Sequence, residues 1–152
     1  FSRWSGALEV PNGDFTKATV NIVIDASSIE TGVADRDAHL KSADFFDVAQ
    51  YPEIRFTATQ FVPQGSVEGR LVGQLTIKGI TREVSLNVER LGEAKDPWGN
   101  ERIAFSAKAS LDRRDFGLTW NQTLETGGVL VGDRVELEVE VEAVRQSATK
   151  VA

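Results

Sequence analysis

Polar and apolar residues alternate along most of this chain, and no other feature constrains the fold as strongly. Between positions 135 and 142, Val135, Leu137, Val139 and Val141 alternate with glutamates. The same period of two extends over further segments, namely 17–25, 53–62, 66–78, 81–91 and 101–111. In 53–62 it places Ile54, Phe56, Ala58 and Val62 on one face. In a strand, successive side chains point to opposite faces, so each segment has one dry face and one wet face. The pattern predicts an all-β protein built from antiparallel strands.

Short turn sequences separate the alternating segments. They are Pro11–Asp14, Pro63–Gly65, Lys78–Gly79 and Asp96–Asn100. Such short connections predict an antiparallel meander of about seven strands that closes into a barrel or pairs as a sandwich. Glycines at dry-face positions 69 and 73 favour the barrel, because glycine permits the sharp bend of a barrel corner.

Two stretches interrupt the alternation. The polar segment Ala34–Ser42 is permissive for one short helix, and Phe116–Gly132 is glycine-rich and predicts a long loop with one helical turn. No apolar run has the roughly 20 residues of a membrane helix. We expect a single domain over residues 1–145 and a flexible tail over 146–152. The chain contains no methionine and begins at Phe1, so we expect that further residues precede it.

Composition narrows the possible functions. With 17 basic and 23 acidic side chains the net charge is −6, which disfavours nucleic acid as a partner. There is no cysteine and only one histidine, so thiolate chemistry and sites with two histidines are excluded. No phosphate-binding loop or dinucleotide fingerprint is present. We therefore expect no metal, no cofactor and no enzymatic activity.

The single histidine, His39, has two interpretations. A catalytic arrangement with Ser42 is conceivable, but no nucleophile-elbow motif accompanies it. The interpretation we favour is a hydrogen-bonded side chain at a barrel mouth, with Arg36 and Asp37 beside it. Asp112 and Asp115 flank Arg113 and Arg114, and this group predicts surface or rim ion pairs rather than a general acid–base couple.

Two adjacent aromatic residues, Phe45 and Phe46, follow the helix-permissive segment. They predict either a plug that covers one end of the core or a lid that lines an apolar cavity. The alternation does not decide between these two roles.

Several separated motifs resemble those of the YceI-like family. They are Arg36–Asp47, Tyr51–Phe56, Gly73–Arg82, Asp96–Gly99 and Arg114–Trp120, and they occur in the family's order between Phe1 and about Arg145. The resemblance implies a lipocalin-like antiparallel β-barrel that holds a polyisoprenoid or similar amphiphile in an elongated apolar cavity. It also implies a bacterial protein of the periplasm or the cytoplasm, often a homodimer.

Family members carry an N-terminal strand pair ahead of the position of Phe1. We therefore expect the strand Trp4–Val10 to need a partner, supplied by a second chain or by residues outside this sequence. A cavity that lacks this strand pair would be incomplete.

The dry-face positions and the loops that close the barrel define the predicted ligand-binding residues. They are Val20, Ile22, Leu40, Phe45, Phe46, Phe56, Leu75, Leu86, Phe105, Phe116, Trp120 and Val139. Small dry-face residues, among them Gly69 and Gly73, are expected to leave volume for the ligand, unless bulky neighbours fill it. The function predicted is storage or transport of a long apolar ligand, an isoprenoid or a fatty chain. The alternatives are an enzyme acting on a lipid headgroup and a packed barrel that binds a protein partner.

Overall fold

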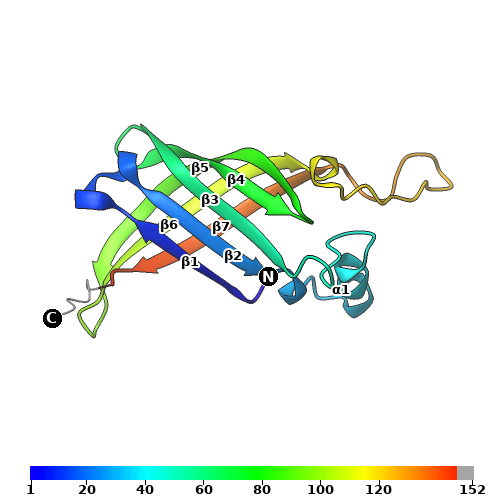
Figure 1. Cartoon of the computed structure of the whole chain (residues 1–152), viewed down its shortest axis with the longest axis horizontal. Coiled ribbons are helices and arrows are strands. Elements are labelled where there is room, and N and C mark those ends of the chain that lie inside the picture. Colours follow the sequence, from blue (N-terminus) through cyan, green and yellow to red (C-terminus); the bar gives the residue numbers. More distant parts are fainter. Residues whose placement is uncertain (147–152) are drawn as a thin grey trace.

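One antiparallel sheet of seven strands, in the order β1 to β7 along the chain, forms the body of the protein. The computed structural model describes residues 1–146. The strands are β1 (Trp4–Glu9), β2 (Thr19–Asp25), β3 (Glu53–Gln64), β4 (Glu68–Ile77), β5 (Ile80–Lys95), β6 (Glu101–Asp112) and β7 (Arg134–Val144). The predicted all-β class and antiparallel meander are confirmed (Figure 1).

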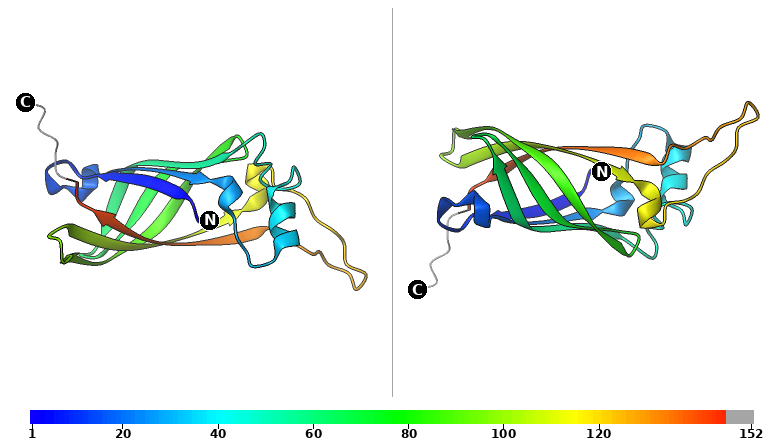
Figure 2. Two further views of the ribbon diagram at one scale, coloured as in Figure 1. Left: turned by 90° about the horizontal axis from the view of Figure 1, so that it is seen from below. Right: turned by 90° about the horizontal axis from the view of Figure 1, so that it is seen from above.

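The sheet curls into a half-barrel whose two edge strands are β1 and β7 (Figures 1 and 2). β1 pairs with β2, with Trp4 opposite Ile24 and Glu9 opposite Thr19, and its other edge carries no strand of the described chain. Pairing of that edge with a second chain stays a prediction, as does the homodimer. The tail predicted for 146–152 lies, apart from Gln146, outside the described residues.

Different structures cover the two ends of the half-barrel. At the end that we call the helix end lie α1 (Ala34–Lys41) and the loop 117–133 (Figure 1). At the opposite end, the turn end, lie the 3-10 turns Pro11–Gly13 and Phe15–Lys17 and the β5–β6 turn (Figure 2). Within residues 1–146, no helix has the length and apolar character needed to cross a bilayer.

A bulge in β3 changes which residues face the core. The β3–β4 register shifts between Ala58 and Gln60, so that Phe61 rather than Val62 lies opposite the buried Leu71. The alternation places Val62 inside with Ile54, Phe56 and Ala58, and this prediction is wrong. One extra residue in a strand turns every later side chain to the other face.

Gly69 and Gly73 do not leave space on the inner face. A Cβ atom on Gly69 would lie 2.1 Å from Cζ of Phe61, and one on Gly73 would lie 2.7 Å from Cζ of Phe56. The two phenylalanine rings therefore occupy the positions that the missing side chains would take. The expectation that these glycines add cavity volume is wrong, because aromatic residues on the neighbouring strand β3 cover them.

We expect Gly69→Ala to destabilise the protein by about 1–3 kcal/mol, because the new methyl group overlaps the Phe61 ring. Chemical denaturation of the two proteins measures this difference. Gly132→Ala is the control, since nothing lies within 4 Å of a Cβ at that position. Adding Phe61→Leu should recover part of the loss at Gly69. Equal stability of Gly69→Ala and the wild type would contradict the overlap.

Candidate functional site

The concave face of the half-barrel is apolar and continuous across the central strands. Ile22 on β2 lies opposite Phe56 on β3, and Phe56 lies opposite Leu75 on β4. Phe56, Leu75 and Leu86 belong to the buried cluster, and Val20 and Ile22 pack against it. The structure thus brings these five predicted ligand-binding residues together on one surface. That this surface holds a ligand stays a prediction.

The other wall of the half-barrel carries Phe105 on β6 and Val139 on β7, both half-buried. Val139 lies opposite Ala107, which packs against the buried cluster. The Phe105 ring meets the ring of Phe15, from the turn before β2, with centroids 6.4 Å apart. Phe15 was not among the predicted lining residues, because it lies outside the alternating segments.

An aromatic cluster covers the helix end of the concave face. The His39 ring lies 5.0 Å from the Phe45 ring and 4.5 Å from the Trp120 ring, both edge to face, and Phe45 and Trp120 lie 5.5 Å apart. Phe45 and Phe116 are buried, and Leu40, Phe46 and Trp120 pack against the same core. The predicted residues of α1 and of the loop 117–133 therefore meet at this end.

The polar residues of α1 hold the adjoining loops. Arg36 donates from Nε to Thr31 Oγ1 (2.8 Å) and from Nη2 to the Thr31 carbonyl (2.6 Å), and the Asp37 carboxylate accepts from the Thr31 amide (2.9 Å). His39 Nε2 lies 2.9 Å from Asp44 Oδ2. These bonds connect α1 to the segments before and after it.

Ser42 does not form the serine–histidine arrangement that the sequence left open. Its hydroxyl donates to the backbone carbonyl of His39 (2.6 Å), while the imidazole faces Asp44. A histidine can act as a general base only when its ring nitrogen reaches the proton it removes. In this geometry Ser42 is a turn residue.

Arg113 is buried and organises the long loop, a role that the sequence did not reveal. Its guanidinium donates to the carbonyls of Leu118 (2.6 Å), Gly132 (2.8 Å) and Trp120 (2.9 Å). Arg113 also lies 3.6 Å from Asp133, between Nη2 and Oδ1, but it forms no ion pair with the flanking Asp112 or Asp115. The exposed Arg114 does pair with Asp112 at 2.7 Å. The long irregular loop could have pointed to this role, because its buried backbone carbonyls have no partner strand and therefore need other hydrogen-bond donors.

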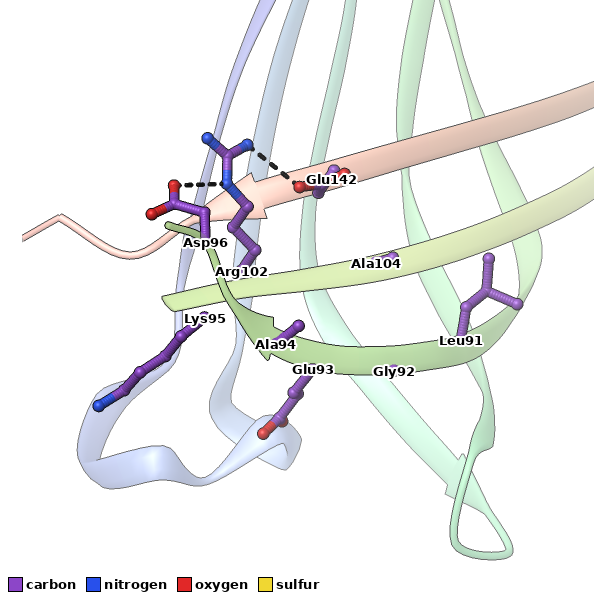
Figure 3. Close-up of a pocket in the computed structure, with 9 residues that line it drawn as sticks. All are labelled: Leu91, Gly92, Glu93, Ala94, Lys95, Asp96, Arg102, Ala104 and Glu142. Atoms are coloured by element: carbon purple, nitrogen blue, oxygen red, sulfur yellow. Dashed lines mark hydrogen bonds and ion pairs between the residues drawn. The ribbon is translucent and has the colours of Figure 1, made fainter. Parts of the chain in front are cut away.

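Two pockets of the described chain lie along β5 and β6. The first, of about 320 Å³, is lined by Leu91, Gly92, Glu93, Ala94, Lys95, Asp96, Arg102, Ala104 and Glu142 (Figure 3). Arg102 crosses it, donating to Asp96 (2.9 Å) and Glu142 (3.1 Å). The second, of about 300 Å³, is lined by the outward-facing Glu68 and Lys108 together with Gly69 and Val88 of the inner face. Neither coincides with the predicted binding residues.

Asp96 holds the β5–β6 turn together. Burial on its own would raise the pKa of Asp96, but hydrogen bonds from Asn100, Arg102 and Trp98 lower it to about 2. The carboxylate accepts from the Trp98 and Asn100 amides at 2.9 Å each. These contacts explain an acidic residue at the start of the Asp-Pro-Trp-Gly turn as a structural requirement.

The low pKa of Asp96 predicts a pH-dependent contribution to stability. Since its folded pKa of about 2 lies below the model-peptide value of 3.8, the contribution is present above about pH 4 and is lost as the pH falls towards 2. We expect Asp96→Asn to lower the Tm at pH 6 and the difference from wild type to shrink by pH 2. Asp35→Asn, on the exposed start of α1, is the control in these thermal melts. A constant Tm difference from pH 6 to pH 2 would contradict the prediction.

Comparisons with known proteins agree with the geometry. A family model described as the YceI-like domain matches residues 1–143. Protein YceI of Salmonella arizonae is 38% identical over 146 residues, 96% of this chain and 73% of that protein. A UPF0312 protein of Pectobacterium carotovorum is 35% identical over 96% of this chain and 72% of its own length.

Two solved structures share the fold. The crystal structure of Campylobacter jejuni YceI superposes with a TM-score of 0.84 at 29% identity, covering 97% of this chain and 84% of that one. Burkholderia cenocepacia BcnA superposes with a TM-score of 0.81 at 21% identity, covering 94% and 85%. Both comparisons support the arrangement of strands described above.

Proposed function

Because the chain belongs to the YceI-like domain family, we propose that it binds a long apolar ligand, a polyisoprenoid or a similar amphiphilic lipid, against the concave face of its half-barrel. The observation that carries this proposal is the continuous apolar lining from β2 to β5, covered at the helix end by the aromatic cluster. In this role the protein stores or carries its ligand.

The lining offers a ligand the right chemistry. Phe56, Leu75 and Leu86 present carbon surfaces from three neighbouring strands. Burial of apolar surface contributes about 25 cal/mol per Å², so a chain of several isoprene units could reach micromolar affinity after the costs of ordering it. A flexible hydrocarbon chain needs no hydrogen-bond partners from the protein along such a surface.

The aromatic pair Phe45–Phe46 would close the binding site at the helix end. Phe45 is 6% exposed and packs against both His39 and Trp120, whereas Phe46 meets the ring of Phe1 at 5.8 Å. The two adjacent rings thus reach different neighbours. This arrangement supports a cover over the end of an apolar chain.

Lipid extraction followed by mass spectrometry tests the proposal. The purified protein should release a long-chain lipid in near-stoichiometric amount, and the stripped protein should take up a fluorescent prenyl probe with micromolar affinity. A protein that yields no lipid and binds no probe would instead be a packed domain, in keeping with the rings that cover Gly69 and Gly73. That outcome would overturn the proposed function.

A further inference from the structure

A charged residue, Arg90, continues the apolar inner row of β5 at the turn end. Val84, Leu86 and Val88 precede it at alternate positions, and its register partner is Phe105 on β6. The guanidinium carbon lies 5.9 Å from the centroid of the Phe15 ring, which itself contacts Phe105. Arg90 is thus placed where the apolar face meets the turn end.

Protein groups leave much of the Arg90 guanidinium free. The side chain of Arg90 is 38% exposed. Its ion pair with Glu93, whose side chain is 65% exposed, is long, at 3.7 Å between Nη1 and Oε1. One Nη2–H reaches the Ser66 carbonyl at 3.3 Å. A guanidinium has five donors in a fork that matches a carboxylate or a phosphate, so several donors are available to a ligand.

Three cations near the helix end, Arg113, Lys78 and Arg82, differ from Arg90. The Arg113 guanidinium is hydrogen-bonded to loop carbonyls, and Lys78 donates to the carbonyl of Ala43 at 2.9 Å. Arg82 occupies the inner row of β5 at that end, opposite Leu75, but it is exposed. The helix end is otherwise covered by the aromatic cluster, which suits a hydrocarbon tail.

We propose that Arg90 binds the anionic head of the ligand, a carboxylate or a phosphate, and orients its apolar tail towards the helix end. This inference rests on the proposed function. A charge-assisted, bidentate contact beside an aromatic ring gives discrimination between acidic and neutral heads on the same tail. Glu93 competes with the head for the same guanidinium.

Retinoic acid and retinol test the inference, because they share one isoprenoid tail and differ in the head. We expect the wild type to prefer retinoic acid by about tenfold in fluorescence titrations, which corresponds to one charge-assisted contact. Arg90→Gln should abolish this preference and leave retinol affinity unchanged. Glu93→Gln should strengthen retinoic acid binding, because it removes the competing carboxylate.

Arg82→Gln is the matched control, because Arg82 lies in the same inner row at the opposite end of β5. It should leave the preference for retinoic acid intact. Competition with geranylgeranoic acid and geranylgeranyl phosphate separates the two kinds of head, and displacement by either that weakens in Arg90→Gln supports the inference.

The possible failures are distinguishable. If both retinoids bind equally well and Arg90→Gln changes neither affinity, the inference is wrong while the proposed function stands. If Arg82→Gln rather than Arg90→Gln abolished the preference, the ligand would lie in the opposite orientation and the inference would be wrong. If neither retinoid nor either competitor binds, the proposed function fails together with the inference.

Discussion

Replacing Leu75 with arginine is expected to destabilise the domain by ~3–5 kcal/mol, enough to unfold a protein of ordinary stability. Leu75 is 7% exposed within the buried cluster, and it lies opposite Phe56 on one side and Arg82 on the other. The new guanidinium would lose its hydration and would face a like charge across the strand pair. Thermal and chemical denaturation, monitored by circular dichroism, measure the loss.

The neighbouring Gln74→Arg is the control for this experiment. Gln74 is exposed on the outer face opposite Glu83, so an arginine there gains an acidic partner and should leave the stability nearly unchanged. Leu75→Ala, expected to cost ~2–5 kcal/mol, provides a milder variant for prenyl-probe binding where it folds. If Leu75→Arg retained both native stability and full probe affinity, Leu75 would not line a buried apolar face.

Local alternation predicted most of the strands because it depends only on which side chains must leave water. It could not locate the bulge near Thr59, since the apolar pattern of β3 accommodates either Phe61 or Val62 inside. The bulge is settled by pairing with β4, where Phe61 covers Gly69. Which of the two residues faces the core depends on how side chains fit across neighbouring strands, and the hydropathy pattern along one strand does not reveal it.

The candidate site, too, could be predicted only in part from the sequence. The inner positions of β2, β3 and β4 follow from alternation, but the curvature that brings Phe15 against Phe105 does not. The sequence predicted Phe45 and Trp120 near the closure of the barrel, and their contact with His39 came only with the structure. Long-range contacts of this kind join segments with no pattern in common.

Arg113 is the clearest residue that sequence reasoning missed. In sequence it adjoins Arg114, and both stand between aspartates. Their environments differ because Arg113 turns inward at the end of β6 and meets carbonyls from residues 118 to 132, whereas Arg114 stays 57% exposed. Nothing in the spacing of the charges distinguishes them.

Arg113→Ala is accordingly expected to cost about 2–4 kcal/mol, because buried loop carbonyls lose their donors. The side chain of Arg113 is 6% exposed, and its three shortest bonds, 2.6 to 2.9 Å, reach Leu118, Trp120 and Gly132. The loop 117–133 should lose its anchor, and Trp120 should separate from His39 and Phe45. Chemical denaturation gives the change in stability, and limited proteolysis with thermolysin should reveal new cleavage within the loop.

Arg114→Ala removes the same charge one residue later and provides the matched control. Arg114 pairs with Asp112 in an exposed position, and such pairs contribute little to stability. This variant should retain wild-type resistance of the loop to thermolysin, and its Trp120 fluorescence should be unchanged when Trp4 and Trp98 are replaced by phenylalanine in every protein compared. Equal proteolysis of the two variants would mean that Arg113 does not anchor the loop, and the cover over the helix end would then depend on the aromatic contacts alone.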